Sequence, residues 1–322
     1  MTLVKAINNA LDIKLQDNKD VVIFGEDVGY EGGVFRVTQG LQQKHGAERV
    51  FDSPLAESGI VGTAVGMAVA GMKPVIEMQF SGFAYPGFNQ MISHVARMRN
   101  RSRGKYTSSM VIRMPYGGGI KALEHHSESM EALYAHIPGL KVVIPSTPHD
   151  AKGLLISAIE SEDPIIYMEP KRIYRAVKQE VSEDKFNVQI GKANIVQQGT
   201  DVTVVSYGAM MRDTQKALAL AKKAGISVEL IDLRTIYPID KETIMKSIKK
   251  TGRLVTVAEA PTTFGIGAEM MAIANEEAFL HLEAPPKRVT GFDTIFPLPQ
   301  GEHHYLPSPE KIYYEIERTV KF

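Results

Sequence analysis

One acidic residue, Glu57, stands at the head of a stretch that contains no other charge. The turn-forming residues 52–54 precede it, and residues 58–71 are small, apolar or hydroxyl-bearing. Ser58 is expected to cap a helix by accepting a backbone N–H, which would put Glu57 at the helix mouth. A carboxylate there is either a solvated acid of the first turn or a buried group with a partner or a raised pKa. Spacing alone does not choose between these readings or name a reaction.

The elements around Glu57 are expected to bring other polar side chains to one edge of a sheet. Residues 21–24 form a short apolar run that predicts a buried parallel strand, and Glu26 follows it. Residues 74–80 predict a second strand, which carries Gln79. Ligands in open α/β sheets bind at the carboxyl ends of the strands. On the helix after Glu57, small residues recur every four positions, so a backbone or a ligand can approach that face: Gly62, Gly66 and Ala70.

Two adjacent histidines, His125 and His126, lie between Glu124 and Glu128. This group looks at first like a set of metal ligands. However, neighbouring residues seldom point at one ion, and no His-x-x-x-His spacing supports a cage. We therefore expect a free-standing catalytic imidazole rather than a zinc site.

Two further stretches have ordinary structural explanations beside functional ones. Residues 81–88 are rich in aromatic side chains, including Phe83, which either pack together or contact a flat ligand. Residues 97–105 carry a run of Arg and Lys that suggests nucleic acid. Because no aromatic residues are interleaved with these charges, a solvated face or a subunit contact is the preferred interpretation.

The composition excludes several classes of protein. The chain has 322 residues, of which 44% are hydrophobic and 23% charged, and 37 basic residues balance 37 acidic ones. A formal charge of zero argues against bulk binding to nucleic acid or to a membrane surface. There is no cysteine, so disulfides and thiolate chemistry are excluded. No apolar run reaches the roughly 20 residues that span a bilayer, and no secretory signal is recognisable, so we expect a cytoplasmic location.

Strand and helix patterns alternate along the chain and predict parallel sheets of the α/β class. Residues 171–200 are polar and irregular and suggest a linker. We therefore expect a catalytic domain at 1–190 and a second α/β domain at 191–322, each large enough for its own core.

Several motifs together resemble the beta subunit of the decarboxylating component of 2-oxo acid dehydrogenase complexes. They cover essentially the whole chain: FGEDV (24–28), GGVFR (32–36), RVFDSPLAE (49–57), EMQF (77–80), NQ (89–90), HS (126–127), KVVIP (141–145) and DLRTIYPID (232–240). The resemblance implies an N-terminal domain that binds the pyrimidine half of thiamine diphosphate. It also implies a transketolase-like C-terminal domain for subunit contact and for docking of the acyltransferase component, through a terminal region that includes Glu283 or Phe322.

The resemblance also assigns residues. Glu57 matches the acid that faces the aminopyrimidine ring, where a hydrogen bond to a ring nitrogen helps to activate the cofactor. The pyrimidine side is completed by four further positions: Glu26, Leu55, Gln79 and Phe83. Phe83 departs from relatives that carry Tyr there, which puts a phenolic hydrogen bond in doubt. His126 matches a histidine that assists decarboxylation and acyl transfer to a lipoyl arm. A monovalent cation such as potassium is implied near three residues: Met110, Val111 and Asp163.

One motif of thiamine enzymes is absent. The motif that binds magnesium and the diphosphate begins with Gly-Asp-Gly, and this tripeptide does not occur in the chain. A cofactor with about two to three negative charges needs a bound metal ion to neutralise them. The resemblance therefore implies that a separate alpha subunit binds magnesium and the diphosphate, in a heterotetramer of two alpha and two beta subunits.

The 2-oxo acid itself is not fixed by these motifs. Residues 55–62 and 259–261 are nearer the branched-chain and broad-specificity relatives, while pyruvate and acetoin enzymes share the same motifs. A stand-alone transketolase-like enzyme is the alternative within thiamine chemistry. A nucleic-acid-binding module that uses residues 97–105 is the non-enzymatic alternative.

Overall fold

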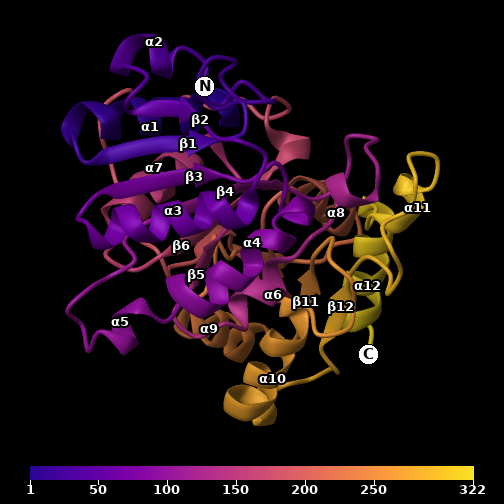
Figure 1. Ribbon diagram of the computed structural model, residues 1–322. Helices are drawn as coiled ribbons and strands as arrows, with labels where there is room; N and C mark the ends of the chain where they lie inside the picture. Colours follow the sequence, from indigo (N-terminus) through magenta and orange to yellow (C-terminus); the bar gives the residue numbers. More distant parts are fainter. The chain divides into compact units, whose positions relative to one another are not determined.

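Strands alternate with helices and build two α/β units (Figure 1). The computed structural model describes all residues, 1–322. The first unit comprises residues 1–116 and 133–190, and the second comprises 117–132 and 191–322. The expected domains, 1–190 and 191–322, differ from these units in residues 117–132, which are grouped with the C-terminal half of the chain. None of the helices is both long enough and apolar enough to cross a membrane.

The strands of the first unit lie in the order β5-β6-β4-β3-β1-β2, and neighbouring pairs are parallel. Every residue of β1, β4 and β6 is buried. Burial on both faces is typical of parallel strands with apolar runs, and here it includes two charged residues, Arg113 and Glu169. The bounds are Val21–Gly25 for β1, Val50–Asp52 for β2, Lys73–Glu77 for β3, Val111–Tyr116 for β4, Lys141–Val143 for β5 and Ile165–Pro170 for β6.

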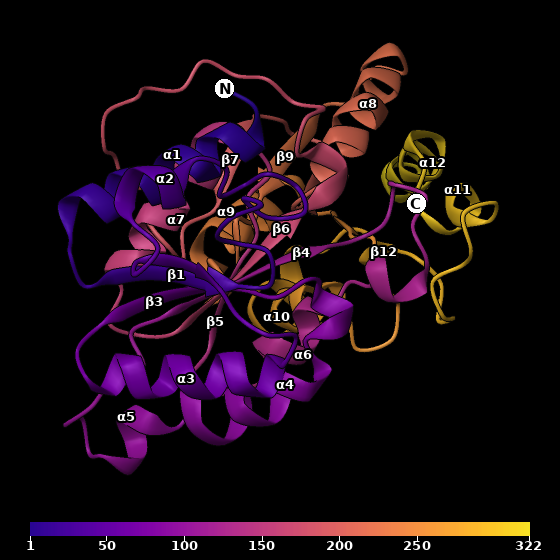
Figure 2. The same ribbon diagram turned by 45° about the horizontal axis from the view of Figure 1, so that its top comes forward.

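Helices cover both faces of this sheet. On one face α1 (Leu3–Asp17) packs against α7 (Pro148–Glu160), and α3 (Glu57–Val69) lies on the other (Figure 2). The side chains of Thr2 and Thr147 cap α1 and α7 by accepting backbone N–H groups. The flat face expected on α3 lies open, since a methyl group at Gly62 or Gly66 would meet no other atom within 4 Å.

The single helix expected at residues 89–105 is wrong. In its place α4 (Tyr85–Gln90) is followed by a π-helical turn, Met91–Val95, and then by the short α5 (Met98–Arg101). A π turn inserts one extra residue, so the 3.6-residue apolar period cannot continue through it. The remaining short helices of this half are α2 (Leu41–His45), η1 (Ser81–Phe83), η3 (Glu124–His126), α6 (Glu131–Ala135) and η4 (Lys171–Ile173).

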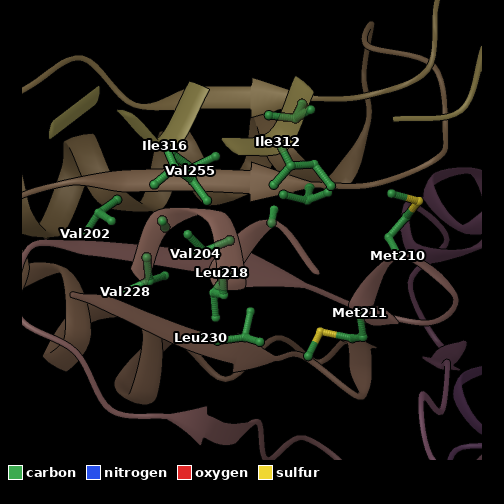
Figure 3. Close-up of a cluster of buried hydrophobic side chains, with 14 residues drawn as sticks. Val202, Val204, Met210, Met211, Leu218, Val228, Leu230, Val255, Ile312 and Ile316 are labelled. Carbon is green, nitrogen blue, oxygen red and sulfur yellow. The ribbon is translucent and has the colours of Figure 1, made fainter. Parts of the chain in front are cut away.

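The second unit has a sheet in the order β12-β11-β8-β9-β7, in which only β7 is antiparallel. Helices α8 and α12 pack together over this sheet, and their apolar side chains meet those of β8, β9 and β11 in the core (Figure 3). The bounds are Asn194–Gln197 for β7, Val202–Ser206 for β8, Met210–Lys223 for α8, Val228–Asp232 for β9, Thr235–Tyr237 for β10, Lys241–Thr251 for α9, Leu254–Val257 for β11, Ile266–Ala278 for α10, Phe279–His281 for η5, Lys287–Val289 for β12, Glu302–Tyr305 for α11 and Pro309–Val320 for α12.

One arginine ties three neighbouring strands of the first unit together. Arg113 of β4 is fully buried and donates to the Glu77 carboxylate of β3 at 2.8 Å. It also donates to the two oxygens of Glu169 on β6 at 2.7 and 3.0 Å. Burial raises the pKa of the Glu77 carboxyl, and the charge of Arg113 opposes that rise. The guanidinium therefore compensates two buried carboxyl groups at once.

Replacing Arg113 by Met should lower the free energy of unfolding by about 3–5 kcal/mol, because two buried glutamates lose their counter-charge. Urea unfolding of the purified protein measures this change. The matched control is Lys44→Met, which removes an exposed ion pair with Asp12 whose atoms lie 2.7 Å apart. That control should cost less than about 1 kcal/mol. Equal losses in the two variants would contradict the importance of the buried cluster.

Candidate active site

Three strands of the first unit bring polar side chains to one edge. Because β3, β1 and β2 are adjacent and parallel, the residues after their carboxyl ends are neighbours. The Gln79 side-chain amide donates to the backbone carbonyl of Glu26 at 2.7 Å. A Cβ at Gly25 would lie 2.5 Å from the carbonyl oxygen of Glu77, so only glycine allows the ends of β1 and β3 to approach this closely. Leu55, after β2, is 79% exposed.

Glu57 is the first residue of α3, and its side chain is largely buried at 9% exposure. The expected cap by Ser58 is wrong. Ala56 occupies the N-cap position without a side-chain cap, and Ser58 lies within the first turn, where its hydroxyl donates to the carbonyl of Pro86. Glu57 thus sits at the helix N-terminus, where the helix dipole favours a negative charge.

No cation of the chain neutralises Glu57 or Glu26 at this edge. No hydrogen bond or ion pair within the chain engages the Glu57 carboxylate, so the alternative in which a partner within the chain neutralises it does not hold. Its electrostatic neighbour is Glu26, a like charge. The pKa of the Glu26 carboxyl is raised, first by burial and then by the charges of Glu57, Asp27 and Glu77. One oxygen of Glu26, Oε1, is buried and has no hydrogen-bond partner.

These observations fit the pyrimidine half of thiamine diphosphate. A ring nitrogen and an exocyclic amino group are the kind of partners that two unpaired carboxyl groups require. Phe83 of η1 is half-buried, and its ring centroid lies 6.4 Å from that of Phe80, so an aromatic surface stands in the same part of the unit. Leu55, by its exposure, is free to contact a ligand or a partner.

His126 belongs to the second unit, in residues 117–132. It ends η3, is half-buried, and its backbone N–H donates to the carbonyl of Leu123 at 3.1 Å. The hydroxyl of the fully buried Ser127 donates to the same carbonyl at 3.0 Å. The His125 side chain is exposed, 3.7 Å from the carboxylate of Glu128. No group of three or more His, Asp or Glu residues is arranged to hold a metal ion.

The residues expected near a monovalent cation lie at the amino ends of the strands. Met110 and Val111 are at the start of β4, and Asp163 precedes β6. The Asp163 carboxylate already contacts Lys141 at 2.9 Å and Arg99 at 3.0 Å. Burial opposes ionisation of Asp163, but the hydrogen bond and charge of Lys141 and the charge of Arg99 lower its pKa. A further cation would therefore depend on backbone carbonyls rather than on this carboxylate.

Sequence reasoning missed the Arg113 cluster, which supports the strand that leads to Gln79. The available signal was a charged residue inside an apolar strand, because a lone arginine there requires a buried acid. Its two acidic partners lie 36 and 56 positions away in the sequence, so spacing could not identify them.

Comparisons with known proteins show the family of the chain. Residues 1–177 match the family described as the transketolase pyrimidine binding domain, and residues 191–312 match the transketolase C-terminal domain. A protein of Acholeplasma laidlawii, named pyruvate dehydrogenase E1 component subunit beta, is 57% identical over 321 residues, which are 100% of this chain and 98% of that protein. This chain belongs to the beta-subunit family of 2-oxo acid dehydrogenases.

Other beta subunits of the family are similar along their whole length. Proteins with the same name from Mycoplasma genitalium and Staphylococcus aureus are each 50% identical, over 99% and 100% of this chain and 98% and 99% of theirs. A solved chain titled "Split gene transketolase, inactive beta4 tetramer" is 22% identical, with a TM-score of 0.82 over 100% of this chain and 99% of that one. The last comparison shows the fold. The family resemblance and the α/β class inferred from sequence are thus confirmed.

Glu26→Gln should stabilise the protein at neutral pH. The folded state raises the pKa of Glu26 above its ordinary value of 4.5, so the ionised carboxylate is disfavoured by folding. In the unmodified protein this loss of stability is absent at pH below 4.5, where the Glu26 carboxyl is protonated in both the folded and the unfolded state. The loss grows as the pH rises through the raised pKa. Melting temperatures of both forms between acidic and neutral pH test this. If the melting temperatures of the two proteins changed in parallel with pH, this prediction would be contradicted.

Proposed function

We propose that this chain is the beta half of a cytoplasmic, thiamine-diphosphate-dependent pyruvate dehydrogenase component. Together with an alpha subunit it decarboxylates pyruvate and passes the acetyl group to the lipoyl group of an acyltransferase. The observation that carries this proposal is the pair of uncompensated carboxyl groups, Glu57 and Glu26, in a unit of the pyrimidine-binding family. The similar proteins named for pyruvate favour this substrate over the branched-chain acids that two sequence motifs suggested.

Bound thiamine diphosphate supplies the carbon nucleophile and the electron sink that decarboxylation requires. With the cofactor bound, Glu57 would share a proton with a nitrogen of the pyrimidine ring. The carboxyl group of Glu26 would accept a hydrogen bond from the same ring. Gln79, Leu55 and Phe83 would line the ring, and the apolar side chains of Leu55 and Phe83 would limit access of water to the shared proton. His126 assists the transfer of the acyl group to the lipoyl acceptor.

The alpha subunit completes the cofactor site in this proposal. It holds magnesium and the diphosphate, since this chain lacks the Gly-Asp-Gly sequence. Two alpha and two beta subunits form a heterotetramer, and the acyltransferase docks on its C-terminal domains. A potassium ion bound by backbone carbonyls near Met110 and Val111 is a further part of the proposal.

Glu57→Gln should reduce decarboxylation by about 10²–10⁴-fold, because an amide cannot share a proton with the ring nitrogen. The measurement is pyruvate decarboxylation by the co-purified alpha–beta assembly with an artificial electron acceptor. Size-exclusion chromatography should show an unchanged assembly. Substantial activity in this variant would remove Glu57 from its role.

The same assay separates the alternative functions. Turnover of 3-methyl-2-oxobutanoate in place of pyruvate would assign the chain to branched-chain acids, and turnover of acetoin would assign it to that reaction. Thiamine-dependent transketolase activity of the chain without an alpha subunit would support a stand-alone enzyme. Retention on DNA at physiological salt, lost when Arg97 and Arg101 are neutralised, would favour nucleic acid binding.

His126→Ala should impair the transfer step more than decarboxylation. Loss of the imidazole should slow acetylation of a free lipoyl domain by about 10²-fold. Decarboxylation with the artificial acceptor bypasses that transfer, so it should fall less. His125→Ala is the matched control, and its exposed side chain predicts little change in either rate. Unchanged transfer by the His126 variant would reject its role.

A further inference from the structure

The segment that carries His126, residues 117–132, is anchored to the second unit ahead of the histidine. Gly118 lies against the Phe296 ring so closely that a Cβ there would be 2.3 Å from a ring carbon. The backbone N–H of Lys121 donates to the carboxylate of Glu302, which is buried, at 3.1 Å. These contacts fix the segment on the amino side of His126.

A second anchor follows His126. The hydroxyl of Tyr207 donates to Oε1 of Glu131 at 2.7 Å, and both side chains are buried. Tyr207 comes directly after β8, the central strand of the sheet, and Glu131 lies five positions after His126. The tyrosine thus connects the histidine segment to the central strand of the sheet.

The second oxygen of Glu131, Oε2, is buried and has no hydrogen-bond partner. Burial raises the pKa of this carboxyl, while the Tyr207 hydrogen bond opposes the rise. The Tyr207 hydroxyl is therefore the side-chain contact that offsets the desolvation of Glu131. Burying this carboxyl costs desolvation free energy, and an apolar pair would hold the histidine segment on β8 equally well. It provides instead a directional bond.

We propose that the Glu131–Tyr207 hydrogen bond positions His126 for acyl transfer, by fixing the carboxyl side of its segment to β8. The pair are positioning residues that act through His126. This inference rests on the proposed function, because it gives the bond a share in a step of that reaction. A purely stabilising bond would affect every activity of the protein alike, whereas a positioning bond affects the step that uses His126.

The decisive variant is Tyr207→Phe, studied in the co-purified alpha–beta assembly. Hydrogen–deuterium exchange should become faster in residues 119–130, because the segment loses its second anchor. Acetylation of a free lipoyl domain should fall by about tenfold, as expected for a displaced catalytic group. Decarboxylation with an artificial acceptor should change by less than about twofold, since that assay omits the transfer.

Three other variants complete the test. Glu131→Gln keeps an oxygen that accepts from Tyr207, so it should retain the exchange pattern and both rates. Tyr313→Phe removes another Tyr–Glu hydrogen bond of the same unit, donated to Glu317 at 2.8 Å, and should change neither rate. If Tyr207→Phe does not assemble, the double variant Tyr207→Phe, Glu131→Met replaces both polar partners by apolar ones. It should assemble and still transfer slowly.

Unchanged transfer in Tyr207→Phe would overturn the inference, and so would an equal loss of both rates or a Glu131→Gln variant that behaves like Tyr207→Phe. The proposed function can fail separately. If the unmodified assembly shows no thiamine-dependent decarboxylation, the role in transfer falls with that function. The rate of hydrogen–deuterium exchange in residues 119–130 then still decides whether Tyr207 anchors the segment.

Discussion

Two carboxyl groups, those of Glu57 and Glu26, share a strand edge without a cation to offset their charges. The parallel order β3-β1-β2 brings the ends of these strands together, so the crowding follows from the sheet itself. Burial raises the pKa of Glu26, and the charge of Glu57 adds to that rise. In the proposed function, a ligand that donates hydrogen bonds to these two carboxyl groups would relieve the repulsion, and this relief would add to its affinity.

The interior of the same sheet treats its acids differently. Glu77 is only two residues from Gln79, yet its carboxylate is bound by Arg113, which also holds Glu169. At the amino ends of the strands, Lys141 and Arg99 likewise compensate Asp163. Within this unit, charge compensation therefore supports the scaffold, whereas Glu57 and Glu26 lack a compensating cation. This contrast within one unit is a more specific indication of a binding site than the acidity of any single residue.

The sequence predicted most of the architecture because buried parallel strands are short apolar runs between amphipathic helices. It failed where local pattern and local structure disagree. Asn194–Gln197 and Lys287–Val289 are short strands in which only Val289 is buried, so no apolar run reveals them. The π turn at Met91–Val95 leaves no compositional trace. The site residues were inferred from family motifs, but the anchoring of Glu131 by Tyr207 joins positions 76 residues apart, which only the fold brings together.

Residues 117–132 have a consequence for any attempt to divide the chain. The matched C-terminal family begins at residue 191, which invites expression of that half as an independent fragment. Such a fragment would lack Lys121 and Glu131, so the buried Glu302 carboxylate and Tyr207 hydroxyl would each lose a bond within the core. Each loss costs about 1–3 kcal/mol, a large share of the stability of a small domain. The two halves are thus interleaved along the polypeptide, and truncation at the linker would yield a poorly folded product.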